Sequence, residues 1–119
     1  MSYSHRQLII HTLGFIAGSS VSNFSHRLHN EDVYMPLTPM FHVHGWGFPY
    51  MATLLGVKQV YPGRYEPKRL LDLIKQEKIT FSHCVPTILQ MLLNENQKLN
   101  YDLSKLKLII GGSAMSKSL

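Results

Sequence analysis

The residues best suited to chemistry lie together in residues 36–50. This stretch holds a His-x-His pair, His42 and His44, and the only tryptophan, Trp46, which stands between two glycines. Zinc requires three or four converging ligands, but this stretch supplies only His42 and His44, and the other five histidines are distant in the sequence. We therefore expect no metal site here. A large indole between two glycines instead favours a shaped apolar pocket, in which the ring has room to move.

Short apolar runs and helical patterns alternate along the whole chain. Strands are expected at residues 33–37, 57–61, 79–84 and 106–110, and helices at residues 4–22, at 44–55, from Pro67, and from Pro86 to a polar stretch that begins at Asn94. This alternation is typical of parallel strands joined by right-handed crossovers. The predicted fold is α/β, a three-layer fragment with about four mainly parallel strands and about four helices. Ligands bind such sheets beyond the carboxyl ends of the strands, which is where residues 36–50 lie.

Local signals predict how individual helices begin, pack and end. Ser4 and Gln7 have the spacing of a capping box, which favours a helix start at this point. Gly14 and Gly18 in the first helix would allow close packing on a neighbouring element. Gly56 suits the C-terminal cap of the helix that follows the Trp46 stretch.

Length, charge and cysteine content limit the kinds of protein and of binding partner that this sequence allows. The chain has 119 residues, enough for one small domain, and a formal net charge of +5. Its basic residues are scattered and form no dense run, so nucleic acid is not an expected partner. Cys84 is the only cysteine, which excludes an intrachain disulfide and favours the cytoplasm. Cys84 itself is expected to be a small buried residue rather than a nucleophile. No apolar stretch is long enough to span a bilayer.

Three segments, taken in order, resemble one family of enzymes. They are Ser-His-Arg-Gln-Leu at residues 4–8, the Pro-Met-Phe-His-Val-His-Gly-Trp segment with Pro-Tyr at residues 39–50, and Val-Pro-Thr at 85–87 followed by Leu-Ile-Ile-Gly-Gly-Ser-Ala at 108–114. The set resembles the adenylate-forming (AMP-binding) enzymes, specifically the medium- and long-chain fatty acyl-CoA synthetases. Residues 1–119 would then be a single partial N-terminal subdomain of that family.

The resemblance implies a two-step ligation. A fatty-acid carboxylate attacks ATP in the presence of Mg²⁺ to give acyl-AMP and pyrophosphate, and the thiol of CoA then displaces AMP. The residues that would form the acyl pocket and its gate are His42, Val43, Gly45 and Trp46. Those that would form a wall beside the adenylate and acyl groups are Gly111, Gly112, Ser113 and Ala114.

Other motifs of the resembled family are absent from this sequence. It lacks the Gly/Ser/Thr-rich phosphate loop, the Tyr-Gly-x-Thr-Glu motif and the C-terminal domain with its adenylation lysine. No complete catalytic set is therefore expected, and ATP, Mg²⁺ and CoA should not bind tightly to this chain alone. Two interpretations stay open. The chain is an inactive part of a fatty-acid–CoA ligase, or it is a non-catalytic acyl- or nucleotide-binding or oligomerisation module. Exposed apolar surface would favour a homo-oligomer.

Overall fold

Helices and strands alternate along the chain in the predicted order. The computed structural model describes residues 2–21, 28–112, 114, 115 and 117, with the backbone alone at residues 20, 21, 43 and 44. The elements are α1 (His5–Val21), β1 (Val33–Pro36), α2 (Val43–Leu55), β2 (Lys58–Gln59), α3 (Pro67–Gln76), β3 (Phe81–Cys84), α4 (Pro86–Leu99) and β4 (Lys107–Ile110). No helix within these described residues is both long enough and apolar enough to cross a membrane.

The four strands form one parallel sheet in the order β2-β1-β3-β4. In this register Tyr34 of β1 lies opposite Phe81 of β3, and Pro36 lies opposite His83. The chain leaves β1 toward β2 on one side, whereas it leaves β3 toward β4 on the other. The two central strands therefore send their connections in opposite directions, which makes the edge between β1 and β3 a topological switch point.

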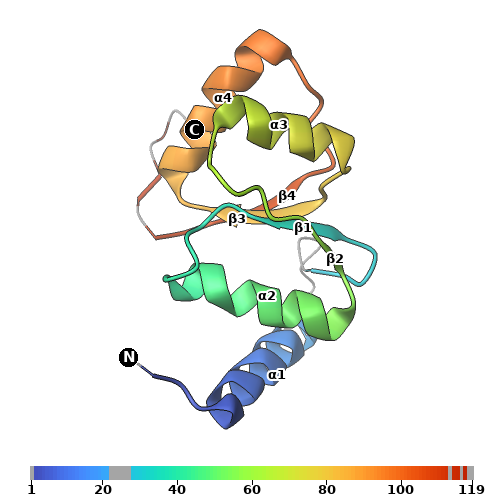
Figure 1. Ribbon diagram of the computed structural model, residues 1–119, viewed down its shortest axis with the longest axis vertical. Coiled ribbons are helices and arrows are strands. Elements are labelled where there is room, and N and C mark those ends of the chain that lie inside the picture. The colour runs from blue at the N-terminus through green and yellow to red at the C-terminus, as the bar shows by residue number, and fades with distance from the viewer. Residues whose placement is uncertain (1, 22–27, 113, 116, 118–119) are drawn as a thin grey trace.

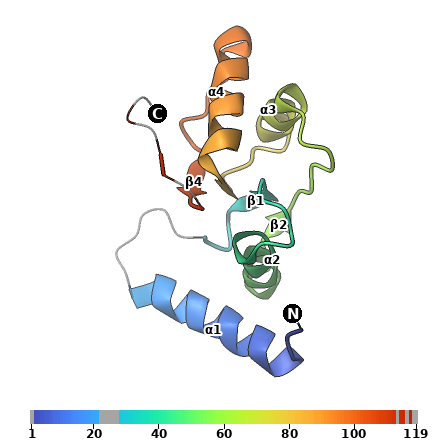
Figure 2. The same cartoon turned by 90° about the vertical axis from the view of Figure 1, so that its left-hand side faces the viewer.

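The helices cover both faces of the sheet, which confirms the predicted three-layer α/β arrangement. Helices α3 and α4 lie on one face, and α2 lies on the other (Figure 1). This division follows from strand order, because right-handed crossovers that run in opposite directions along a sheet place their helices on opposite faces. Helix α1 packs on α2, on the side of α2 that faces away from the sheet, and both views agree on this placement (Figure 2).

Two buried clusters hold the layers together, one on each face of the sheet. The cluster under α3 and α4 consists of Met35, Leu37, Leu70, Leu71, Ile74, Ile79, Cys84 and Leu92. The cluster under α2 consists of Leu28, Tyr34, Phe48, Met51, Ala52, Val57 and Phe81. The split follows the alternation of side chains along each strand, which sends Tyr34 to one face and Met35 to the other. Cys84 is fully buried, as predicted.

Most helix boundaries follow the local sequence signals. The Ser4 N–H donates to Gln7 Oε1 at 2.7 Å and the Gln7 N–H donates to Ser4 Oγ at 3.1 Å, which confirms the capping box. Pro67 and Pro86 are the first residues of their helices, where a missing N–H has no cost. Gly56 caps α2 in the left-handed conformation, with φ of 70°.

Two expectations are wrong. Helix α4 does not end at Asn94 but continues to Leu99, and Asn100 caps it in the left-handed conformation. Gln97 and Lys98 are exposed in the last turns, while Leu99 still packs on the core. In addition, Gly14 and Gly18 do not pack closely on a neighbour, because a Cβ added at either position would meet nothing within 4 Å.

A partly buried ion pair joins the amino ends of three strands. Lys107 Nζ lies 2.8 Å from Asp32 Oδ2, and the Thr80 hydroxyl donates to Asp32 Oδ1 at 2.7 Å. The His29 N–H donates a third hydrogen bond to this carboxylate at 2.7 Å. Because the side chain of Asp32 is only 7% exposed, these donors replace the water that an ionised carboxylate requires. The cluster therefore stabilises the edge of the sheet opposite the switch point.

Candidate functional site

The segments that follow β1, β3 and β4 meet at the carboxyl edge of the sheet. The Leu37 N–H donates to the His83 carbonyl at 3.2 Å, and the Gly111 N–H donates to the Cys84 carbonyl at 3.2 Å. A Cβ on Gly112, whose φ is 95°, would lie 3.3 Å from Val85 Cγ1. These hydrogen bonds join the segments that follow β1, β3 and β4. They lie at the edge where parallel α/β sheets bind ligands.

The first turn of α2 packs tightly against the chain that leads into it. The His42 N–H donates to the Pro39 carbonyl at 3.1 Å, and the Trp46 N–H donates to the His42 carbonyl at 2.9 Å. Gly45 is buried against this turn. A Cβ at position 45 would lie 2.1 Å from the Pro39 carbonyl oxygen and 3.0 Å from that of Thr38. Only a residue without a side chain fits at this contact.

Trp46 is in the first turn of α2, and its half-buried side chain packs toward α1. The centroid of its aromatic ring system is 5.2 Å from that of Tyr3 and 5.3 Å from that of His11. Gly47 is also close to α1, since a Cβ there would lie 3.3 Å from His11 Cε1. Gly45 therefore lets α2 approach the backbone of Pro39, and Gly47 lets α2 approach His11 of α1. This role differs from giving the indole room to move. The Nδ1 atom of His11 is buried beside this contact without a hydrogen-bond partner.

The other predicted site residues differ in how far they are described. His42 is exposed, and its ring centroid lies 4.4 Å from that of Phe41, which is 79% exposed. Gly111 is half-buried and Ala114 is exposed. Only the backbone is described for Val43, and Ser113 lies outside the described residues. The described members of the predicted pocket and wall thus lie along the carboxyl edge or the first turn of α2.

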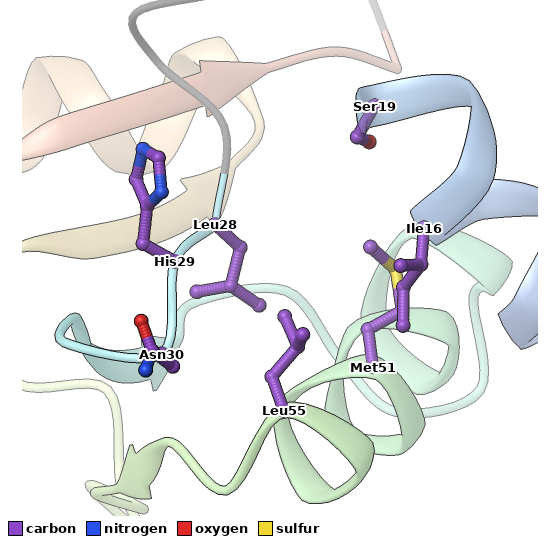
Figure 3. A pocket seen from close by; sticks show the side chains of 7 residues that line it. All are labelled: Ile16, Ser19, Leu28, His29, Asn30, Met51 and Leu55. Atoms are coloured by element: carbon purple, nitrogen blue, oxygen red, sulfur yellow. The ribbon is translucent and has the colours of Figure 1, made fainter. Parts of the chain in front are cut away.

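A cavity of about 230 Å³ opens at the opposite end of α2 (Figure 3). Its lining side chains come from the C-terminal halves of α1 and α2 and from the segment before β1, namely Ile16, Ser19, Leu28, His29, Asn30, Met51 and Leu55. None of the predicted acyl-pocket residues whose side chains the structure describes belongs to this lining. Because α2 runs antiparallel to the strands, the cavity lies toward the amino ends of the strands and away from Trp46 and Gly45.

Two helix N-termini lie at the carboxyl edge. Both α2 and α4 begin there, and neither has an acidic residue in its first turn or a side-chain hydrogen bond from its N-cap. The free N–H groups of a helix N-terminus carry a partial positive charge, which favours anionic groups. Within the described residues no group of three or more His, Cys, Asp or Glu side chains could hold a metal ion.

A buried polar chain under this edge was missed by the sequence prediction. The Tyr34 hydroxyl hydrogen-bonds to His83 Nε2, and His83 Nδ1 lies 3.0 Å from Thr38 Oγ1. Tyr34 and His83 are fully buried and Thr38 is 1% exposed, and burial raises the pKa of Tyr34. A signal was present in the sequence. His83 alternates with Phe81 in an apolar strand, so the two side chains must share the inward face.

Comparisons with known proteins agree with this geometry. The AMP-binding enzyme family matches residues 2–119. The chain is 43% identical over 119 residues to a long-chain-fatty-acid–CoA ligase of Thermus thermophilus, and 34% identical over 125 residues to a medium-chain-fatty-acid–CoA ligase of Ectopseudomonas oleovorans. Each alignment covers 98% of this chain but 21% of the relative. The chain thus spans about a fifth of the length of these curated relatives.

Solved structures share the fold. A long-chain-fatty-acid-CoA ligase from Archaeoglobus fulgidus superimposes with a TM-score of 0.74 at 26% identity, over 93% of this chain and 22% of that structure. The structure of CmiS6 superimposes with a TM-score of 0.75 at 22% identity, over 94% of this chain and 26% of that structure. Sequence and fold lead to the same conclusion: the chain belongs to the AMP-binding enzyme family and carries an α/β portion of its fold.

Proposed function

We propose that this chain forms the acyl side and part of the adenylate side of the active site of an ATP-dependent fatty-acid–CoA ligase. The supporting relatives are fatty-acid–CoA ligases by name. The observation that carries the proposal is the meeting of the segments after β1, β3 and β4 at the switch point. The Leu37 N–H donates to the His83 carbonyl there, and the Gly111 N–H donates to the Cys84 carbonyl. Those segments are the ones whose sequences resemble the family.

In this proposal the first turn of α2 faces the acyl group. His42, Val43 and Gly45 line the acyl pocket, and Trp46 is the gate to the acyl chain. A fatty acyl chain gains about 0.8 kcal/mol for each CH₂ group that leaves water, so an apolar wall is needed. The free N–H groups at the starts of α2 and α4 attract the fatty-acid carboxylate or the adenylate phosphate.

The wall beside the nucleotide is formed by the segment after β4, at Gly111, Gly112, Ser113 and Ala114. Gly111 and Gly112 let the backbone approach a flat adenine ring closely. In the complete ligase, ATP supplies the adenylate, Mg²⁺ neutralises phosphate charge and CoA supplies the thiol. The 119 residues contain neither the Gly/Ser/Thr-rich phosphate loop nor the Tyr-Gly-x-Thr-Glu motif of the resembled family, so we expect this chain by itself to make neither acyl-AMP nor acyl-CoA.

A chimera tests the proposal directly. Residues 1–119 replace the matching segment of the Thermus thermophilus long-chain ligase, with which they share 43% identity. The chimera should form acyl-CoA from ATP, CoA and either octanoate or palmitate, whereas the purified chain should release no pyrophosphate under the same conditions. Trp46→Ala in the chimera should change the ratio of kcat/KM for the two acids. A folded chimera without ligase activity would refute the proposed function, and an unchanged ratio would refute the gate.

A second candidate function, a non-catalytic oligomerisation module, is favoured by one observation. Ile9, Ile10 and Leu13 on α1 are each more than half exposed. A contiguous apolar helix face of this kind promotes association in water. If copies of this chain associate through α1, light scattering after gel filtration should give a mass above 13.6 kDa. Leu13→Glu should then restore the monomer mass, whereas Gln76→Glu on the exposed side of α3 should not. A wild-type monomer at all concentrations would exclude the homo-oligomer.

A further inference from the structure

A consistent set of hydrogen bonds can be drawn through the buried chain of Tyr34, His83 and Thr38. The Thr38 hydroxyl donates to the His83 carbonyl at 3.3 Å, so its oxygen is available to accept a proton from His83 Nδ1 at 3.0 Å. His83 Nε2 then accepts the proton of the Tyr34 hydroxyl. Each donor meets an acceptor when His83 is neutral and carries its proton on Nδ1. Aromatic packing fixes the plane of the imidazole, because Phe48 stacks on it at 4.6 Å with an interplanar angle of 19°.

Thr38 connects this chain to the candidate site. Its carbonyl oxygen and that of Pro39 form the surface against which Gly45 packs. The Pro39 carbonyl also accepts the N–H of His42, the N-cap of α2. A movement of Thr38 therefore moves the surface that supports the first turn of α2. His83 holds Thr38 at two points, through Nδ1 and through its own backbone carbonyl.

We propose that His83 is a positioning residue, which sets the first turn of α2, and with it His42 and Trp46, by holding Thr38 at the carboxyl edge of β3. This deepens the proposed function, because that turn is the proposed acyl side of the site. The bond from Nδ1 to Thr38 positions the turn, whereas the bond from Tyr34 to Nε2 orients the ring and contributes to stability. His83 does not contact substrate in this role.

Two variants of nearly unchanged shape separate these bonds. Thr38→Val removes the oxygen that bonds His83 Nδ1, and Tyr34→Phe removes the hydroxyl that bonds Nε2. Each variant removes one hydrogen bond to the ring of His83, and Thr38→Val also removes the bond from its hydroxyl to the His83 carbonyl. Both variants should therefore unfold at lower urea concentrations than the wild type. They should differ in the first turn of α2. With glycine and tryptophan labelled with ¹⁵N, Thr38→Val should shift the backbone amide resonances of Gly45 and Trp46, and Tyr34→Phe should leave them in place.

A second pair of variants replaces the histidine itself. Asparagine at position 83 places an amide donor near the position of Nδ1, so His83→Asn should retain the wild-type resonances of Gly45 and Trp46. Glutamine reaches toward the position of Nε2, so His83→Gln should shift them as Thr38→Val does. Rescue by asparagine and not by glutamine is a pattern that loss of packing alone would not produce, because glutamine is the larger of the two side chains.

The chimeric ligase gives the functional readout. Thr38→Val in the chimera should raise KM for palmitate by at least about fivefold, because it removes both hydrogen bonds between Thr38 and His83 and each is worth about 1 kcal/mol. Its kcat should change less, and Tyr34→Phe should leave KM unchanged. Equal shifts of the Gly45 resonance in Thr38→Val and Tyr34→Phe would overturn the positioning role, as would no shift in either. These resonances are measured in the chain alone. An inactive chimera would thus refute the ligase function and leave the positioning role to be decided by the resonances.

Discussion

Gly45→Ala is the sharpest test of how the candidate site is packed. The new Cβ would lie 2.1 Å from the Pro39 carbonyl oxygen, 2.8 Å from the Pro39 carbonyl carbon and 3.0 Å from the Thr38 oxygen. Side-chain Cβ atoms essentially never approach other atoms within 3.0 Å. The first turn of α2 must therefore move by about 1 Å, because all three obstructing atoms are backbone atoms and cannot rotate away.

The expected destabilisation follows from two opposing effects. Overpacking a rigid site costs about 1–3 kcal/mol, and a backbone obstacle places Gly45→Ala at the upper end of that range. Alanine is favoured over glycine within a helix by up to about 1 kcal/mol, and this offsets part of the cost. We expect a net loss of about 2 kcal/mol in the free energy of unfolding. For a chain of this size, that loss lowers Tm by roughly 6–10 °C.

Urea denaturation followed by circular dichroism measures the stability, and the fluorescence of Trp46, the only tryptophan, reports on the moved turn. Gly14→Ala is the matched control, since Gly14 lies in a helix and its new Cβ would meet nothing within 4 Å. It should raise stability by about 0.5–1 kcal/mol. If Gly45→Ala behaved like Gly14→Ala, the close contact between α2 and Pro39 would be refuted.

Three further predictions concern the ion pair and the buried thiol. Burial raises the pKa of Asp32, but the hydrogen bond from Lys107 and two others outweigh it, and the net pKa lies below the ordinary value of 3.8. Ionised Asp32 therefore contributes to the free energy of unfolding above that value, and this contribution is lost as pH falls through the lower pKa of the folded state. Unfolding measured at decreasing pH should show this loss in the wild type and less of it in Asp32→Asn. Lys107→Met leaves a buried carboxylate without its cation and should lower the free energy of unfolding by about 2–3 kcal/mol, measured by urea denaturation. Lys58→Met removes the cation of an exposed pair and should cost under about 1 kcal/mol. Equal losses would contradict the burial of the first pair. Burial raises the pKa of Cys84 to about 11, so a thiol reagent at neutral pH should modify it only as fast as the chain unfolds, and rapid modification in native buffer would contradict its packing.

Several features of the fold could be predicted because local chemistry decides them. Pro67 and Pro86 begin helices, since proline lacks the N–H that a first turn does not use. Gly56 ends α2 because the left-handed cap has little room for a side chain. Apolar runs separated by helical patterns imply parallel strands buried on both faces. Which residues line the candidate site stays a prediction from the resemblance to a family.

Other features could not be predicted, because they depend on which residues face each other across the fold. The polar residues after Asn94 resembled a helix end, yet only the packing of Leu99 on the core shows that the helix continues. Gly45 and Gly47 were expected to give the indole freedom, but the approach of Pro39 and His11 shows that these glycines admit close contacts. In the sequence His83 is one of seven histidines with no distinguishing motif. Only the pairing of β3 with β1 brings it into contact with Tyr34 and Thr38.

The amino-acid sequence by itself determined the alternation of elements, the helix starts and the family, because proline, glycine and apolar periodicity act within a few residues of chain. The tertiary structure alone decided the strand order β2-β1-β3-β4 and, with it, the switch point. It also decided that Thr38 and His83, 45 residues apart, share a buried hydrogen bond. The physical reason is that a buried polar group must find a partner wherever the fold supplies one, and that partner need not be near in the sequence.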